Sequence, residues 1–253
     1  MEIFLISLRS GSYGNGYIVS DGFTSLLFDA GVPKKFVVGA MREFGIPKPN
    51  NIFISHEHTD HIKTLDILVR AFSPTVYATA GTFGAMSIGT NGADREIVDV
   101  GNEIAIGNFA IRFIPKPHDA AEPVSFIVEH TSGEKIAIIT DIGYPEKSVI
   151  DAVKNANTLL IESNYEPEML RNSDYPDNLK KRIAGGNGHL SNLQCVEFLK
   201  EMSFGKLSTV ILGHLSEKNN SPRLAFDRAK SQIPQKTKLL VASRYEPVAV
   251  KVK

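Results

Sequence analysis

The chain has 253 residues, with 28 Lys and Arg against 28 Asp and Glu, 42% hydrophobic residues and a single cysteine. This composition excludes disordered, collagen-like and coiled-coil proteins and provides enough apolar residues for a sizeable core. One cysteine cannot form an internal disulfide, which favours a reducing compartment. No window approaches the roughly 20 apolar residues of a membrane span, so we expect a cytoplasmic protein with no membrane partner.

The charge is distributed unevenly although its sum is zero. Residues 1–170 contain 13 basic and 21 acidic residues, whereas residues 171–253 contain 15 basic and 7 acidic residues. A neutral sum would ordinarily argue against a polyanionic partner, but a basic last third leaves that possibility open.

Hydrophobic periodicity predicts alternating strands and helices along the chain. The first third predicts strands at 3–8, 16–20, 25–28, 52–54 and 76–78, with helices at 34–44 and after His61. The middle predicts strands at 103–106, 109–114, 124–129 and 135–139. The last part predicts helices at 146–154, 179–183, 193–202 and 222–231 between strands at 158–161, 209–212 and 238–241. Two similar halves, each β-rich and then α/β, predict one α/β domain over residues 1–253, a four-layered αββα sandwich.

A dense cluster of potential metal ligands follows the strand predicted at 52–54. His56, His58, Asp60 and His61 fall within six residues, in a chain with only seven histidines. Neutral imidazoles and carboxylates are the groups that bind Zn²⁺, Mn²⁺ and Fe²⁺. A chance cluster of this density at a strand end is improbable, so we interpret the segment as a metal site that can supply two ions.

Three further polar residues follow apolar strands: His118, Asp141 and His214. Sites in α/β sheets usually lie at the carboxyl ends of strands. Each residue alone would more often be a hydrogen-bonded structural residue. The presence of the first cluster makes a role as metal ligand the favoured interpretation. We therefore expect these three residues to complete a binuclear centre.

Together these residues resemble the signature of the metallo-β-lactamase-fold hydrolases over nearly the whole chain. The resemblance implies an αββα sandwich. It implies that one metal is bound by His56, His58 and His118, the second by Asp60, His61 and His214, and that Asp141 bridges both. In true β-lactamases a Cys commonly occupies the second site, whereas Cys195 lies in an apolar helical stretch here and is expected in the core.

Two further motifs resemble the nuclease branch of this superfamily. Gly11-Ser12-Tyr13-Gly14-Asn15 and Gly188-His189-Leu190-Ser191-Asn192 are similar to segments of the YycJ/WalJ-type bacterial proteins, which are associated with DNA 5′-exonuclease activity. His189 and Glu162 also fill places that a His and a Glu occupy in RNase Z. We expect substrate contacts from Ser12, Asn15, Glu162, Ser191 and Asn192. The 11–16 segment could instead be a tight turn, and His189 a capping residue.

The chemistry implied is metal-assisted phosphodiester hydrolysis. Two divalent ions, Zn²⁺ or Mn²⁺, lower the pKa of a bridging water and neutralise charge that develops on the phosphorus. Asp60 aims the resulting hydroxide, and His189 protonates the leaving oxygen, a general-acid step worth typically about 10²–10⁴-fold. Sequence-independent binding of nucleic acid is expected from a basic groove, with candidates Lys180, Lys181, Arg182, Arg223 and Arg228.

Two other functions are compatible with the same ligands. One is a small-molecule hydrolase, acting on a cyclic phosphodiester, a thioester or a lactone. A closed pocket around residues 11–16 and His189 would favour it, and an open basic groove would favour nucleic acid. The other is a non-catalytic metal-binding module, which purified protein without metal would favour. Neither metal identity nor oligomeric state can be predicted from these residues.

Overall fold

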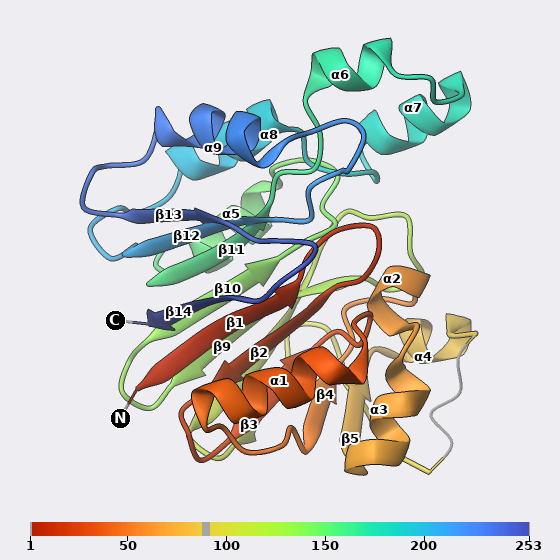
Figure 1. Cartoon of the computed structure of the whole chain (residues 1–253), viewed down its shortest axis with the longest axis vertical. Helices are drawn as coiled ribbons and strands as arrows, with labels where there is room; N and C mark the ends of the chain where they lie inside the picture. Colours follow the sequence, from red (N-terminus) through yellow and green to blue (C-terminus); the bar gives the residue numbers. More distant parts are fainter. Residues whose placement is uncertain (1, 88–91, 253) are drawn as a thin grey trace.

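The computed structural model describes residues 2–87 and 92–252. Two seven-stranded sheets pack face to face, and helices cover the outer side of each sheet (Figure 1). This arrangement confirms the predicted αββα sandwich. Among the described residues, no helix is both long and apolar enough to span a bilayer.

The first sheet is built from the N-terminal strands and closed by the last strand of the chain. Its order is β14-β1-β2-β3-β4-β5-β6. The strands are β1 (Ile3–Arg9), β2 (Gly16–Ser20), β3 (Ser25–Phe28), β4 (Asn51–Phe53), β5 (Thr75–Ala78), β6 (Asp94–Ile97) and β14 (Val248–Val252). The helices of this half are α1 (Lys34–Phe44), α2 (Thr59–Ile62), α3 (Leu65–Phe72) and α4 (Ala80–Ala85).

The second sheet has the order β13-β12-β11-β10-β9-β8-β7. Its strands are β7 (Glu103–Ile106), β8 (Phe109–Pro115), β9 (Val124–His130), β10 (Lys135–Ile139), β11 (Thr158–Glu162), β12 (Thr209–Gly213) and β13 (Lys238–Val241). The helices are α5 (Lys147–Val153), α6 (Pro167–Asn172), α7 (Asp177–Ala184), α8 (Asn192–Lys200) and α9 (Pro222–Lys230). The α6–α7 pair projects beyond the layer that α8 and α9 form (Figure 1).

The prediction missed β6, β14, α4 and α6, and one helix expected after His61 is two short helices. The strand β14 pairs antiparallel with β1, with Val252 opposite Ile3. The strand β6 has no buried residue and a weak apolar signal, whereas the alternating valines of β14 are a strand pattern that the prediction overlooked.

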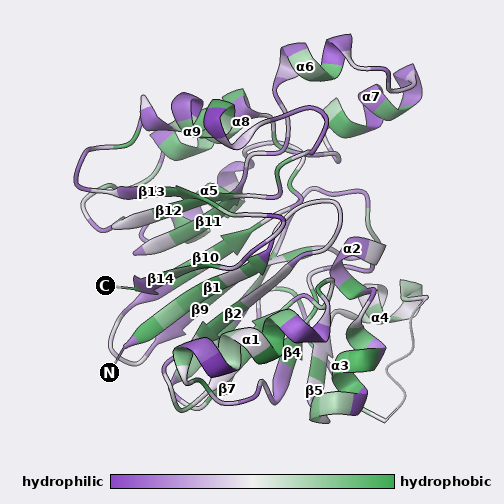
Figure 2. Ribbon diagram, viewed as in Figure 1, coloured by the Kyte–Doolittle hydropathy of each residue, from purple (hydrophilic) through white to green (hydrophobic). Residues whose placement is uncertain are grey.

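An aromatic cluster fills the space between the two sheets. Phe28 and Phe53 from the first sheet face Phe113 and Phe126 from the second, and all four are essentially buried. The ring centroids of Phe28 and Phe126 are 5.0 Å apart, and those of Phe53 and Phe113 are 6.0 Å apart. Figure 2 shows the strands as mostly hydrophobic, whereas the helices carry polar residues on their outer faces. Packing of this cluster therefore fixes one sheet against the other.

The strand directions bring several loops to one edge of the sandwich. In the first sheet β3, β4 and β5 are parallel, and in the second β10 to β13 are parallel. Their carboxyl ends therefore meet at a common edge. At this edge the backbone N–H of His214 donates to Ser10 Oγ at 2.7 Å, which links the second sheet to the first.

Replacing a central ring tests the packing between the sheets. Phe53→Ala should lower the free energy of unfolding by about 3–5 kcal/mol, because it leaves a cavity that rings of both sheets line. Phe23→Ala is the matched control, since this ring is 77% exposed, and its effect should stay within about 0.5 kcal/mol. Urea denaturation measures both. Equal effects of the two substitutions would contradict the proposed role of the cluster.

Candidate metal centre

Three imidazoles converge at the common edge of the sheets. His56 Nε2 lies 3.1 Å from His58 Nδ1, which lies 3.2 Å from His118 Nε2. His56 follows β4, His58 precedes α2, and His118 follows β8. These three ring nitrogens form the first group that could hold a metal ion.

A second group lies beside the first. Asp60 Oδ2 is 3.4 Å from His61 Nε2 and 3.3 Å from His214 Nε2. Asp60 and His61 belong to α2, and His214 directly follows β12. One carboxylate and two imidazoles at these distances can hold a second ion.

The Asp141 carboxylate lies between the two groups. Its Oδ2 is 3.2 Å from His61 Nε2, and its Oδ1 is 3.4 Å from His214 Nε2 and 3.9 Å from His118 Nε2. Asp141 is buried, and Oδ2 makes no regular hydrogen bond. A buried carboxylate oxygen without a hydrogen bond is costly unless a cation compensates it, so this atom fits a metal ligand.

In three of the candidate ligand histidines, Nδ1 donates a hydrogen bond to an acceptor outside the ligand groups. His61 Nδ1 donates to Asp29 Oδ2 at 2.7 Å, and His214 Nδ1 donates to Glu162 Oε1 at 2.7 Å. His118 Nδ1 donates to the carbonyl of Gly188 at 3.0 Å. These bonds hold Nδ1 and orient each ring so that Nε2 points at the centre, as the second nitrogen of metal-binding histidines is usually held. The residues present therefore fit two metal ions.

Backbone strain concentrates at the same edge. Asp29, Asp141 and His214 have positive φ angles of 60°, 54° and 54°. Non-glycine residues in this region cost of order 1–3 kcal/mol each and persist where the surroundings fix them. Each of these residues follows a β-strand, so the left-handed conformation turns its side chain from the strand direction into the centre.

The pKa values of the buried candidate ligand histidines shift in two opposite directions. Burial lowers the pKa of His56 well below its usual value and that of His118 to about 4, so both are neutral at pH 7. Burial also opposes the charge on His61 and His214, but neighbouring carboxylates outweigh it. Asp141 and Asp29 raise the pKa of His61, and Asp141, Asp60 and Glu162 raise that of His214 to about 10.

His189 lies at the exposed rim of the centre. Its Nδ1 donates to Glu162 Oε1 at 2.9 Å and lies 3.6 Å from Asp141 Oδ1. Glu162 is fully buried, and its Oε2 accepts from the backbone N–H groups of Ile142 and Leu190, each at 3.0 Å. Burial would raise the pKa of Glu162, but His189 and His214 lower it to about 2. This carboxylate therefore holds a rim histidine and a ligand candidate together.

The 11–16 segment is a tight turn that supports the metal loop. The backbone N–H of Asn15 donates to the Asp60 carbonyl at 2.8 Å, and Asn15 Nδ2 donates to Asp60 Oδ2 at 3.0 Å. A Cβ on Gly31 would lie 1.6 Å from the Asp60 carbonyl oxygen. Gly31 therefore permits a close approach that any side chain would prevent.

Four of the five side chains expected to contact substrate are buried in this structure. Asn15 and Glu162 lie behind the candidate ligands that they hold. Ser191 caps α8 in a capping box with Gln194, and Asn192 donates to Glu166 and Asn220. Ser12 is the exposed member of the set. The motif marked residues near the site, but spacing alone did not show which side chains face solvent.

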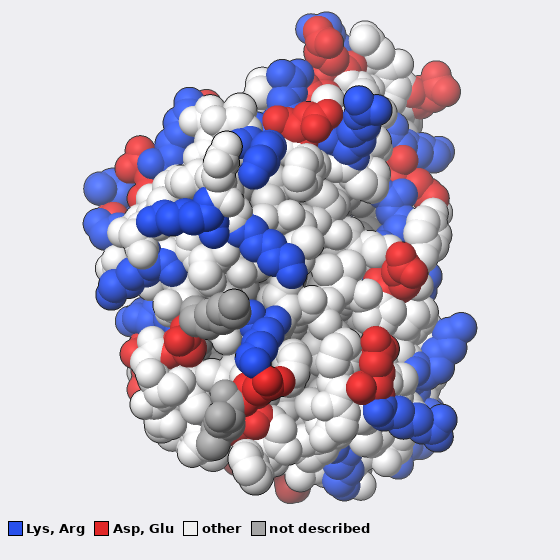
Figure 3. Space-filling model, turned by 60° about the vertical axis from the view of Figure 1, so that its left-hand side comes forward, with Lys and Arg blue, Asp and Glu red and all other residues white. Residues whose placement is uncertain are grey.

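The expected basic groove is only partly supported by the side chains. Arg182 pairs with Asp119, which lies beside His118, whereas Arg228 and Arg223 pair with Glu166 and Asp227. Lys180 donates to a carbonyl on its neighbour α6, and Lys181 is exposed on α7. Figure 3 shows Lys and Arg side chains scattered over one face of the molecule, with Asp and Glu among them. Several of the candidate basic residues are therefore paired with carboxylates and do not line an open basic groove.

Two buried residues near the centre escaped the prediction. Asp29 supports His61 and accepts from the backbone N–H of Ser55 at 2.8 Å. It directly follows the apolar strand β3, so the rule that selected His214 would have found it. Lys116 is buried and donates from Nζ to the Thr140 carbonyl at 2.7 Å, next to Asp141. Its basic side chain in a short Pro-flanked segment gave no sequence signal.

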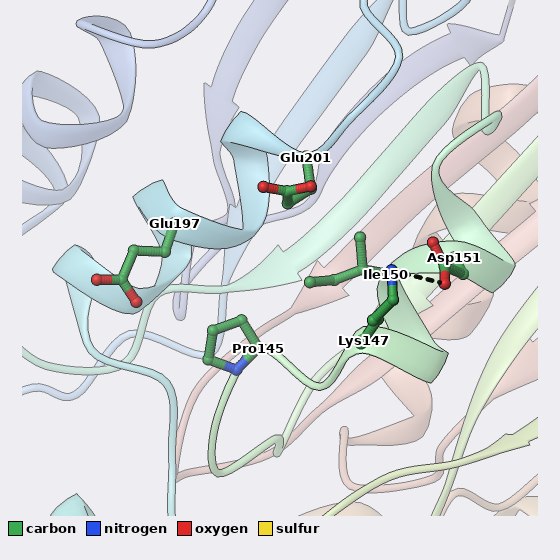
Figure 4. A pocket seen from close by; sticks show the side chains of 6 residues that line it. All are labelled: Pro145, Lys147, Ile150, Asp151, Glu197 and Glu201. Carbon is green, nitrogen blue, oxygen red and sulfur yellow. Dashed lines mark ion pairs between the residues drawn. The ribbon is translucent and has the colours of Figure 1, made fainter.

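A separate hollow of about 380 Å³ lies between α5 and α8, away from the centre. Figure 4 shows its acidic lining, with Glu197 from α8, Glu201 directly after that helix, and an ion pair between Lys147 and Asp151 on α5. These side chains do not converge on a common point (Figure 4).

Comparisons with known proteins agree with this geometry. The family description "Beta-lactamase superfamily domain" matches residues 24–215. The chain is 35% identical to exodeoxyribonuclease YycJ of Bacillus anthracis, covering 89% of this chain and 87% of the relative. It is 32% identical to exodeoxyribonuclease WalJ of Streptococcus pneumoniae serotype 2, covering 90% and 87%. In structure it is similar to the metallo-β-lactamase-fold protein YhfI of Bacillus subtilis, with a TM-score of 0.75, 18% identity and coverage of 99% and 100%.

The αββα fold and the histidine-aspartate centre define a metallo-hydrolase of the metallo-β-lactamase fold. The chain belongs to the β-lactamase superfamily, and the curated relatives above are exodeoxyribonucleases. The resemblance inferred from the motifs is confirmed, and with it the assignment as an enzyme.

Metal uptake should depend on pH differently at the two groups. In protein stripped of metal by a chelator, His61 and His214 are protonated at pH 7, so an ion that binds there must displace protons. Below the raised pKa, affinity should fall about tenfold per pH unit for each proton displaced. Binding at the other group should release fewer protons, because His56 and His118 are already neutral at pH 7.

Calorimetric titration in buffers of different ionisation enthalpy measures the protons released per ion. We expect one binding step with proton release and one with little. Two steps with equal pH dependence would contradict the assigned protonation states.

Proposed function

We propose that the protein is a two-metal phosphodiester hydrolase that degrades DNA as an exonuclease, without sequence preference and from the 5′ end. The observation that carries this proposal is the position of Asp141 between two ligand groups, with His189 beside them. Two adjacent divalent ions are the arrangement that phosphate-ester hydrolysis uses in many enzymes. The exodeoxyribonuclease relatives support DNA as the substrate.

The ligand residues have separate roles in this proposal. His56, His58 and His118 would hold one ion, Asp60, His61 and His214 the second, and Asp141 both. When bound, Zn²⁺ or Mn²⁺ supplies an acidified water and neutralises charge on the phosphate. The side chain of Asp60 is 23% exposed, so a water molecule can reach it. Its carboxyl group is ionised, because His61 and His214 lower its pKa more than partial burial raises it. Its carboxylate can therefore accept a hydrogen bond from the attacking water.

His189 is positioned to act as the general acid. Because Nδ1 donates to Glu162, the proton for a leaving oxygen must come from Nε2. The Glu162 carboxylate fixes the orientation of the ring, as the carboxylate does for the histidine of a catalytic triad. The ring is 22% exposed and can reach a substrate at the rim.

The exposure of the centre favours a polymer over an enclosed small molecule. The side chains of His58, Asp60 and His189 are 28%, 23% and 22% exposed, so the centre opens to solvent along one side. A large substrate can pass such a rim without entering a closed cavity. A small-molecule hydrolase is the alternative outcome of the test below.

Removal of the shared carboxylate tests the proposal. Asp141→Ala should lose metal from both groups and lower cleavage of end-labelled DNA by at least about 10³-fold, because both ions lose a ligand. Elemental analysis and gel assays of single- and double-stranded DNA and RNA measure the two effects. Asp151→Ala, which removes a carboxylate on α5 away from the centre, is the matched control. Wild-type protein that hydrolyses thioesters or cyclic phosphodiesters but no DNA would overturn the nuclease assignment.

A leaving-group comparison tests His189. His189→Ala should retain its metal and cleave DNA about 10²–10⁴-fold more slowly, since the leaving oxygen is no longer protonated. Hydrolysis of bis(4-nitrophenyl) phosphate should fall much less, because nitrophenolate leaves without a proton. Equal losses on both substrates would exclude the general-acid role.

A further inference from the structure

Exposed tyrosines gather at the metal edge. Tyr13, Tyr144 and Tyr245 are 61%, 43% and 67% exposed. Tyr13 lies in the turn between β1 and β2, Tyr144 between β10 and α5, and Tyr245 between β13 and β14. All three loops lie at the edge where the candidate ligands converge. Core packing does not account for rings left this exposed.

The loops that carry Tyr13 and Tyr245 pack together beside the second ligand group. Ser10 donates from its backbone N–H to the Ser243 carbonyl at 3.1 Å, and its Oγ accepts from the His214 backbone N–H at 2.7 Å. A Cβ on Gly11 would lie 3.2 Å from the Leu215 carbonyl oxygen and 3.9 Å from Arg244 Cβ. The turn with Tyr13 also holds Asp60 through Asn15. Both rings therefore lie on loops that contact residues of the metal centre or their direct neighbours.

A hollow and several charged side chains accompany these rings. The hollow has a volume of about 220 Å³ and a mainly apolar lining that includes Ser10, Leu215, Pro222, Val241, Arg244 and Tyr245. Lys63 donates to the Tyr13 carbonyl. Lys218 Nζ lies 5.5 Å from the centre of the Tyr175 ring. Glu217 lies 3.9 Å from Arg244 Nη1 and raises the pKa of the Tyr13 hydroxyl, so it offsets part of this positive charge.

We propose that Tyr13 and Tyr245 form a stacking platform for unpaired bases of single-stranded DNA next to the phosphate at the metal centre. This inference rests on the proposed nuclease function. Aromatic faces accept any base, and cations beside them attract the phosphates, which together give binding without sequence preference. Lys63 and Arg244 supply cations here. Bases must be unstacked from a duplex to use such a platform, so single strands should bind best.

Binding of a phosphorothioate oligothymidylate, which resists cleavage, tests the platform. Tyr13→Ala and Tyr245→Ala should each weaken binding about 5- to 150-fold, the range found for loss of one base–aromatic stack. Tyr13→Phe and Tyr245→Phe should retain affinity, because the ring remains. Phe23→Ala is the matched control, since it removes an equally exposed ring from the turn between β2 and β3, which lies at the opposite edge. Fluorescence anisotropy of labelled oligonucleotide gives the affinities.

Tyrosine emission provides a second readout, because the chain has seven Tyr and no Trp. Stacking should quench this emission when the oligonucleotide binds, and the quench should shrink in both Tyr→Phe variants although their affinity is kept. If wild-type protein cleaves DNA and both alanine variants bind as Phe23→Ala does, the platform is overturned and the nuclease function stands. If wild-type protein neither binds nor cleaves DNA, both are overturned.

Discussion

The arrangement of the site depends on one buried carboxylate. Asp141 is 1% exposed, lies within 4 Å of imidazoles from both ligand groups, and carries its charge in a low-dielectric interior. An isolated carboxylate there would be protonated or excluded from the fold, so its surroundings must compensate it. His61, His214 and the nearby Lys116 supply that compensation and hold its pKa low despite burial. Two metal ions would replace part of this charge.

Support for that carboxylate extends outward through both sheets. Glu162 at the end of β11 fixes His214 and His189, and Asp29 after β3 fixes His61. The cluster of phenylalanines between the sheets holds one sheet against the other. The candidate ligands that follow strands of both sheets therefore lie close together. Local strain at Asp29, Asp141 and His214 is sustained by this framework. The same loops then present Tyr13 and Tyr245 to solvent beside the ligands.

The sequence predicted the fold and the location of the centre because both leave strong local signals. Apolar runs marked most central strands. In the His56–His61 segment, the density of potential metal ligands is higher than chance would give. The side chains that support the centre were harder to assign. The local sequence around a carboxylate such as Glu162 is the same whether the side chain faces substrate or a histidine. Exposed edges such as β6, and Tyr13 within a glycine-rich turn, depend on tertiary contacts that periodicity does not record.

Anomalous diffraction from crystals grown with Mn²⁺ or Zn²⁺ would locate the bound ions. Two peaks per chain are expected. One should lie among His56, His58 and His118, the other among Asp60, His61 and His214, and Asp141 should contribute an oxygen to each. A single peak, or two peaks with Asp141 turned away from one of them, would contradict a centre organised around the shared carboxylate.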